Sequence, residues 1–488
     1  MHIFTVKVKI SAQVRRNDEK IEQSYSIRGV DGELCVTMGD PGDGLQLGGF
    51  MKRLFGRHGR VKVLTLFATA GTLAASAALV PLEAGASSSV IHLTMWQQWG
   101  GGHEEQQLQG AINQYEALHP NIQITQTPVT NDAKILTAIT GGTPPDIVDL
   151  GTSAALGAWA SEGAVQPLGP LISASHLNLN QYVPSGLKAV TVNGQLYALP
   201  FENFDVGLLY NKALFKAAGL NPNDPPTTIA QLNADAKKLT IVSKNGAIKQ
   251  LGFVPNYPGP SQGQDCPLMT YGFLYGGSWF GKNGKPTPDT KQNVAALTWE
   301  KNIYSEFGAQ KVANFISSAG AYLTSADPFE SGKVAMTLDG PWQLQYIEAN
   351  RPSYAKNIGT AGFPAPSSVN RGSTFVDTNA QFIPRGSKHV AAAFAFISWL
   401  TTNKLLSSQF SDAVANLPQL KSVPSFALEK DPRFRVFMQE AAAKTAHEWG
   451  QSAISSQYTT QLCQAQDSVL IGGESPSAAL AGLASSVG

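Results

Sequence analysis

The chain has 488 residues, and its 36 Lys and Arg against 35 Asp and Glu give a net charge of +1 at pH 7. Residues 87–488, which we expect to form the mature protein, carry 25 basic and 27 acidic residues, so they have no cationic excess for binding nucleic acid or anionic lipid. About 400 residues normally form two domains, because single hydrophobic cores stop growing at roughly 250–300 residues.

The first 86 residues have the pattern of a leader. Residues 1–50 are charged and turn-rich, and Met51 is followed by a basic cluster, an apolar run at 63–80 and the small residues Ala-Gly-Ala. This order is typical of a secretory signal peptide. We therefore expect residues 1–50 to be an over-translated or non-native extension, residues 51–86 to be a signal peptide cleaved near Ala86, and the mature protein to be extracytoplasmic. A genuine cytoplasmic extension is the alternative for residues 1–50.

Strands and helices alternate in the first part of the mature chain. Residues 90–96 alternate as a strand and lead into the loop WQQWGGG, which contains Trp96 and Trp99. Helix, strand, helix, strand and helix patterns follow at residues 104–119, 122–127, 133–139, 147–150 and 153–162. This alternation predicts a parallel sheet with helices on both faces, and thus an α/β fold.

A strand-to-helix junction further along the chain carries an aromatic residue. Residues 334–338 form a short apolar run, Gly-Pro at 340–341 turns the chain, and residues 342–348 have the pattern of a first helical turn. Trp342 would therefore lie at the carboxyl end of a strand, the sheet edge where α/β proteins bind ligands. Its indole offers a flat apolar face and one N–H donor, which suits a sugar ring, whereas packing in a core is the alternative.

Three polar interruptions divide the apolar runs. They lie at residues 201–205 (FENFD), at residues 374–379 (TFVDTN) and at residues 416–424. Each separates apolar segments of strand or helix type, and the first falls near one third of the mature chain. We interpret the three as crossings of the chain between two lobes.

The catalytic and metal-binding motifs are incomplete. His103 and His447 each begin the letters of a zinc-protease helix, but glutamine stands where the second histidine must bind the metal. The letters G-x-S-x-G at 259–263 lie in a Pro-rich loop and not between a strand and a helix. Cys266 and Cys463 leave two alternatives, a disulfide outside the cytoplasm or two thiols. We expect no catalytic residue, no metal site and no cofactor, and therefore not an enzyme.

Several segments together resemble one protein family. They are WQQWG at 96–100, GGTPPDIV at 141–148, LYNKALF at 209–215, FESGKVAM at 329–336 with Gly-Pro-Trp at 340–342, and the helix positions Ala392, Phe394, Ile397 and Leu400. In their order and spacing they resemble the extracellular solute-binding proteins of ABC importers, and among these the sugar-binding cluster that includes maltodextrin-binding protein. The resemblance covers residues 90–488.

The resemblance implies a two-lobed periplasmic-binding-protein-like fold of type II, with three hinge crossings, that closes around its ligand. Lobe I would contain residues 87–203 and 377–421, and lobe II residues 204–376 and 422–488. It also implies a saccharide ligand, in the first place an oligosaccharide, an ABC permease as the membrane partner and a monomeric state. The alternatives are binding of glycerol-3-phosphate or another non-sugar solute, and a secreted glycan-active enzyme.

The expected ligand-binding residues are aromatic rings and polar side chains, several of which the resemblance places where members of this family contact their ligands. They are Trp96, Trp99, Ser153, Glu202, Asn203, Tyr257, Trp342, Asn379, Trp449 and Tyr458. Glu202 and Asn203 have a structural alternative, since they can also bond hinge backbone groups. Trp159 and Trp399 lie in apolar helices, and we expect them in cores. The acidic crossover residue of maltodextrin-binding protein aligns with Phe204, which argues against maltodextrin and leaves another saccharide.

Overall fold

The computed structural model describes residues 9–17, 20–29, 32–38, 89–99, 102–257 and 266–488. The chain divides into two units, Met1–Ala84 and Gly85–Gly488. In the first unit, strands β1 (Lys9–Asn17), β2 (Lys20–Gly29) and β3 (Gly32–Met38) form an antiparallel sheet in that order. The predicted signal peptide at residues 51–86 lies outside the described residues.

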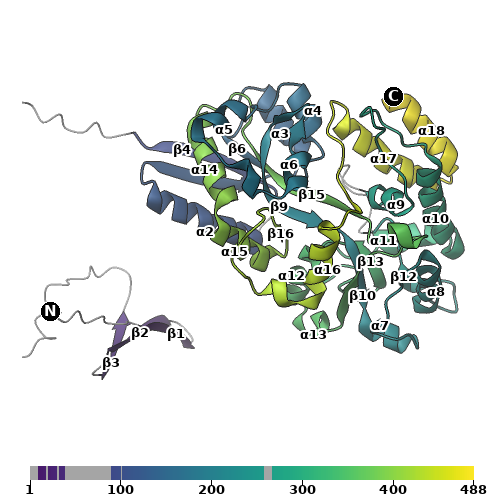
Figure 1. Ribbon diagram of the computed structural model, residues 1–488. Helices are drawn as coiled ribbons and strands as arrows, with labels where there is room; N and C mark the ends of the chain where they lie inside the picture. Colours follow the sequence, from purple (N-terminus) through teal and green to yellow (C-terminus); the bar gives the residue numbers. More distant parts are fainter. Residues whose placement is uncertain (1–8, 18–19, 30–31, 39–88, 100–101, 258–265) are drawn as a thin grey trace, which may run out of the picture. The chain divides into compact units, whose positions relative to one another are not determined.

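The second unit contains two large sheets, one in each of two lobes (Figure 1). A two-stranded sheet is formed by β7 (Thr191–Val192) and β8 (Gln195–Leu196). The lobe I sheet has the order β16-β9-β15-β6-β4-β5, and β17 pairs with β15. Its strands are β4 (Ile91–Gln97), β5 (Ile122–Pro128), β6 (Ile147–Leu150), β9 (Ala198–Asp205), β15 (Thr374–Phe382), β16 (Leu417–Pro418) and β17 (Ala446–His447). The expected parallel sheet is confirmed for β4, β5 and β6. Strand β9 is antiparallel to β15 and β16, and β15 is antiparallel to β6 but parallel to β17.

Helices pack on both faces of the lobe I sheet, as the alternating pattern predicts. They are α2 (His103–Leu118), α3 (Asp132–Thr140), α4 (Leu156–Ser161), α5 (Gly169–Ser175), α6 (Pro184–Ala189), α14 (Val390–Thr402) and α15 (Lys404–Val414). Ile147 belongs to the core cluster of α2, α14 and α15, and its neighbour Val148 to the cluster of α3 and α4. Successive strand residues point to opposite faces, so the two clusters lie on opposite sides of the sheet.

The lobe II sheet has the order β11-β12-β13-β10-β14. Its strands are β10 (Gly207–Asn211), β11 (Ile241–Val242), β12 (Ile248–Phe253), β13 (Val334–Asp339) and β14 (Ile358–Ala361). The remaining α-helices of the second unit are α7 (Lys212–Ala217), α8 (Ile229–Leu239), α9 (Leu268–Leu274), α10 (Lys291–Phe307), α11 (Ala309–Ser317), α12 (Trp342–Asn350), α13 (Pro352–Ala355), α16 (Pro432–Ala441), α17 (Ser455–Leu470) and α18 (Pro476–Val487). The expected strand, turn and helix around Trp342 are confirmed as β13 and α12.

The lobes are connected by β9 and β15, which run side by side between them (Figure 1). Every residue of both strands is buried. The polar residues 201–205 and 374–379, which interrupt the apolar runs of the sequence, lie within β9 and β15. Their polar side chains reflect the packing of two strands at the junction of the lobes. A third passage follows α15 through β16 to α16.

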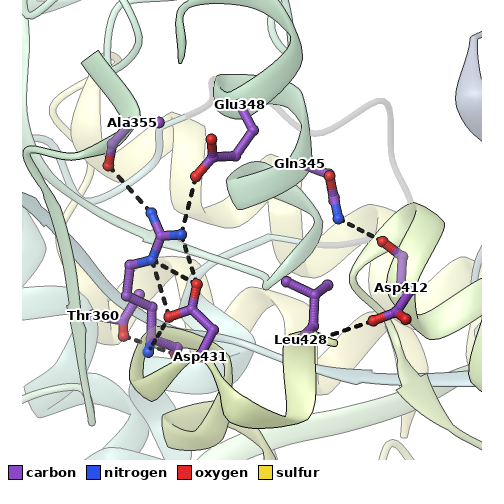
Figure 2. Close-up of polar contacts among 8 residues, drawn as sticks. Gln345, Glu348, Ala355, Thr360, Asp412, Leu428 and Asp431 are labelled. Atoms are coloured by element: carbon purple, nitrogen blue, oxygen red, sulfur yellow. Dashed lines mark hydrogen bonds and ion pairs between the residues drawn. The ribbon is translucent and has the colours of Figure 1, made fainter. Parts of the chain in front are cut away.

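The third passage is fixed to both lobes by polar contacts (Figure 2). On the lobe I helix α15, the Asp412 carboxylate accepts hydrogen bonds from the backbone N–H groups of Ala427, at 2.9 Å, and Leu428, at 2.8 Å. Its backbone oxygen accepts a 2.6 Å bond from Gln345 Nε2 on the lobe II helix α12. At the start of α16, the Arg433 guanidinium binds both carboxylate oxygens of Asp431 and the backbone oxygen of Ala355.

Replacing Arg433 by methionine is expected to lower the free energy of unfolding by about 2 kcal/mol, because hydrogen bonds to charged groups contribute roughly 1.5–3 kcal/mol and Asp431 would lose its partner. Urea denaturation monitored by circular dichroism measures the loss. Arg435 is exposed on the same helix, so Arg435→Met is the matched control and should change stability little. Equal effects of the two substitutions would contradict a specific role for the Arg433 contacts.

Among the described residues, no single helix has both the length and the hydropathy needed to cross a membrane. Helices α14 and α15 reach that level only when taken together, and they meet at a bend of 71°. Their apolar side chains, including Phe394, Leu400 and Phe410, are buried in the lobe I core.

The two cysteines of the mature chain lie in one core. Cys266 and Cys463 are both buried in the largest cluster of lobe II, where they are present as thiols. Of the two alternatives left open by the sequence, the structure has the thiols. Trp159 is 3% exposed in the lobe I core, and Trp399 packs against the neighbouring cluster, as expected for both.

Candidate ligand-binding site

A cavity of about 500 Å³ lies between the lobes. Its walls come from segments far apart in the chain: Gln98, Trp99, Glu104, Val129, Thr130, Asp132, Ile135, Asp149, Leu150, Gly151, Thr152, Phe204, Tyr322, Leu323, Trp342, Tyr346, Asn379, Val414 and Asn416. On the lobe I side, the segments that follow β4 and β6 line it, so the cavity lies at the carboxyl ends of parallel strands. On the lobe II side, the start of α12 lines it.

Trp342 is the aromatic residue at the lobe II wall. Its indole is half-buried and lies against Phe204 of β9, with ring centroids 5.5 Å apart and planes at 86°. The preceding turn needs glycine, because a Cβ on Gly340 would lie 1.9 Å from an indole carbon of Trp342. The close approach of ring to backbone therefore sets the direction in which the indole points.

A chain of hydrogen bonds holds this indole in place. Trp342 Nε1 donates to Tyr322 Oη at 2.8 Å, and Tyr322 Oη donates to Asp339 Oδ1 at 2.7 Å. Asp339 ends β13 and is buried, and this burial raises its pKa to about 7. Since the N–H is already bonded, the free part of the indole is its apolar face, which suits contact with the C–H face of a ring.

The lobe I wall contains Trp99. Its ring packs against Phe201 and Phe410, with centroid distances of 6.2 and 6.4 Å, and the residue is only 9% exposed. Most of this indole belongs to the lobe I core, and one side of it reaches the cavity. Trp96, three residues earlier, is not among the cavity residues, and the Lys134 ammonium lies 5.6 Å from its ring centroid.

Carboxyl and amide groups meet beneath the cavity. Glu202 Oε2 accepts from Asn416 Nδ2 at 3.2 Å and from Asn379 Nδ2 at 3.5 Å. Asp149 is 1% exposed, and neither of its carboxylate oxygens has a hydrogen-bond partner among the described residues. Burial, followed by the charge of Glu202, raises the pKa of Asp149, and burial raises the pKa of Glu202 to about 8. These groups offer acceptors to whatever occupies the cavity.

Ser153 lies beside the cavity and forms hydrogen bonds with residues from two other segments of the chain. Its Oγ donates to Asp377 Oδ1 at 2.5 Å and its N–H donates to Asp377 Oδ2 at 3.0 Å, while Gln451 Nε2 donates to the Ser153 Oγ at 3.0 Å. Residue 153 is buried, and the three residues before it line the cavity. The contacts join the end of β6 to β15 and to the segment before α17.

Of the ten expected site residues, Trp99, Trp342 and Asn379 line the cavity. Glu202 does not line the cavity, but its Oε2 accepts a hydrogen bond from the cavity residue Asn379. Asn203 lines a separate cavity of about 580 Å³ beside the third passage, and its Nδ2 donates to the Pro418 oxygen. The structure places the remaining aromatic residues in the lobe II cores: Tyr257, Trp449 and Tyr458.

Several cavity residues were not identified from the sequence. Asp149 carries a signal that was available, because it is a charged residue in the otherwise apolar strand 147–150. Tyr346 lies four residues after Trp342 on α12 and so shares its face of the helix. Tyr322 lies in an irregular segment, where the sequence has no periodicity to indicate direction.

Comparison with known protein families identifies the family of this chain. The model of the family described as bacterial extracellular solute-binding protein matches residues 101–405. The chain belongs to this family. A maltotriose-binding protein of Pyrococcus abyssi is 22% identical over 66% of this chain and 65% of its own length. A mannitol-binding protein of Pseudomonas aeruginosa is 24% identical over 71% of this chain and 76% of its own length. The match to the first of these thus covers slightly less than two thirds of that relative.

Solved structures of solute-binding proteins have the same fold. CpMnBP1 with mannobiose bound superimposes with a TM-score of 0.73 at 28% identity, covering 81% of this chain and 99% of that chain. The same protein with mannotriose bound gives 0.74 at 29%, covering 82% and 100%. The two-lobed type II fold and the resemblance to sugar-binding members of the family are confirmed. The relatives named here are binding proteins, and the family is described as extracellular.

Proposed function

We propose that this solute-binding protein is the receptor of an ABC importer and binds a short oligosaccharide between its lobes. One observation carries the proposal: the half-buried indole of Trp342 faces, across a cavity of about 500 Å³, a lobe I wall that contains Asn379 and Asp149. An aromatic face combined with hydroxyl acceptors is what a sugar requires, and the volume is within the range of about 300–1,000 Å³ usual for small-molecule sites.

The mechanism depends on contact with both lobes. Stacking on the Trp342 face removes the C–H surface of a sugar ring from water, and the carboxyl and amide oxygens of Asp149, Asn379 and Asn416 replace water at its hydroxyl groups. A ligand that touches both walls binds the closed form more tightly than the open form and so shifts the population toward closure. The closed form is then the one that a permease would recognise.

The relatives support a saccharide. CpMnBP1 was solved with mannobiose and with mannotriose, and two curated relatives are named for maltotriose and mannitol. We also propose the lobe limits expected from the sequence, residues 87–203 with 377–421 and residues 204–376 with 422–488, and export by the signal peptide at 51–86. Strands β9 and β15, which contain two of these limits, support them.

Titration of intrinsic tryptophan fluorescence with mannobiose, mannotriose, maltotriose, mannitol and glycerol-3-phosphate tests the proposal. We expect a saturable change with at least one neutral saccharide, because Trp342 would be covered on binding and Trp99 lies at the opposite wall. Calorimetry of the same pairs checks the stoichiometry of one ligand per chain. No saturable response to any saccharide would contradict the proposal, and a response to glycerol-3-phosphate alone would point to an anionic solute.

A further inference from the structure

The cavity between the lobes has an uneven charge. Three carboxyl-bearing residues, Glu104, Asp132 and Asp149, line it. Lys, Arg and His are absent from its described lining residues. The cation next along α3, Lys134, is exposed and lies over the Trp96 ring, which is not part of the cavity. A ligand phosphate or carboxylate would meet the like charges of Glu104 and Asp149, and no cavity-lining residue among those described is a cation.

Asp149 adds an observation that points to a ligand. Two other buried carboxylates have donors from the protein, since Asp377 accepts from Ser153 and Asp339 accepts from Tyr322. Asp205 also has no donor to either oxygen among the described residues, but it does not line the cavity. Asp149 is 1% exposed, lines the cavity, and has no donor to either oxygen among the described residues. A buried acceptor without a partner is costly, so the missing donors are expected to come from the occupant of the cavity.

The aromatic wall is also suited to a cation. Trp342, Tyr322 and Tyr346 line the lobe II side, and Phe204 lies between the lobes. A cation over the face of such a ring is attracted by its quadrupole. Aromatic rings on one wall and carboxyl groups on the other therefore surround the occupant with partners for positive charge.

We propose that this cleft selects its saccharide by charge: it binds an amine-bearing sugar more tightly than the neutral sugar of the same skeleton, and it rejects the corresponding uronic acid. The inference rests on the proposed function, because it names the chemical class of saccharide for the same cavity. An ammonium group has three donors and no acceptor, which matches the two unpartnered oxygens of Asp149.

The charges around Asp149 support the direction of this preference. Burial and the charge of the neighbouring Glu202 raise the pKa of Asp149. Burial, and to a smaller extent the charge of Glu104, raise the pKa of Glu202. These acidic groups repel one another when they are ionised. An ammonium in the cavity supplies the opposite charge that favours their ionised forms, whereas a carboxylate would add a further negative charge.

Calorimetry with four matched ligands tests the proposal. The probes are the neutral saccharide that binds most tightly in the fluorescence panel, its 2-amino and 6-amino deoxy derivatives, and its 6-carboxylate derivative. We expect at least one amine to bind tenfold or more tightly than the neutral parent, and the carboxylate to bind at least tenfold more weakly. If the neutral sugar binds and both amines bind equally or more weakly, the inference is overturned while the proposed function stands. If none of the saccharides binds, the proposed function itself is overturned.

Two variants assign the preference to the cleft. Asp149→Asn and Glu104→Gln keep the size of each side chain and remove its charge, and each is expected to reduce the ratio of amine to neutral affinity by fivefold or more. Because the readout is a ratio for the same folded variant, a general loss of affinity does not imitate the result. Glu162→Gln, at an exposed acid outside the cavity, should leave the ratio unchanged. An unchanged ratio in both cleft variants would contradict the assignment.

Discussion

Replacement of Trp342 by alanine is expected to weaken saccharide binding by roughly 30-fold or more, since truncation of a central aromatic residue costs about 2 kcal/mol or more of binding free energy. The indole is half-buried, its N–H is bonded to Tyr322, and its free face lines the cavity. Truncation of Trp342 to alanine therefore removes mainly the apolar ring surface that would contact the ligand. Calorimetric titration with the best ligand of the panel measures the change.

Three further variants separate this role from packing. Trp342→Phe keeps an aromatic face and should retain most of the affinity, and Tyr322→Phe removes the bond that orients the indole and should cost less than the alanine variant. Trp399→Phe, at a partly buried ring of lobe I outside the cavity, is the matched control and should bind as the unmodified protein does. If Trp342→Ala binds the ligand with unchanged affinity, the indole does not contribute to the binding site.

The sequence predicted those parts of the fold that local patterns determine. The alternation of residues 90–96 and 122–127 matches β4 and β5, and the turn before Trp342 begins α12 at that residue. The strands that join the lobes could not be predicted this way. They are buried along their whole length, yet they contain Glu202, Asn203 and Asp377, and a rule based on hydropathy takes such residues for an interruption.

A site residue could be predicted from the sequence where a local feature, such as a turn at the end of a strand, fixes the direction of its side chain. Trp342 is such a residue, because the strand end and the Gly340 turn together place its ring. Asp149 and Tyr322 come to the cavity through pairing of β6 with β4 and through an irregular segment, which are tertiary arrangements. Tyr257 and Tyr458 were expected mainly from the resemblance to the family, and the sequence has no pattern that distinguishes a tyrosine at a cleft from one in a core.

The stability of the protein is expected to fall as pH rises from about 5 to 8, and Glu440→Gln is expected to reduce this fall. Glu440 lies on α16, is 8% exposed, and its buried position raises the pKa to about 8. Its charge also helps burial to raise the pKa of Asp205 at the end of β9. The folded protein thus keeps a proton on Glu440 that the unfolded chain releases above pH 4.5, and so folding becomes less favourable as pH increases through this window.

Urea denaturation at pH 5, 6, 7 and 8 measures the effect. Each pH unit between the two pKa values changes the free energy of unfolding by about 1.4 kcal/mol for one such group, so the variant should match the unmodified protein near pH 5 and exceed its stability by up to roughly 3–4 kcal/mol at pH 8. A glutamine resembles the protonated acid in shape and stays neutral, which is why the difference grows with pH. Glu162→Gln, at an exposed position, should follow the unmodified protein at every pH. If the free energy of unfolding of Glu440→Gln changes with pH in the same way as that of the unmodified protein, the Glu440 carboxyl is already ionised in the folded protein, with a donor or water compensating its charge.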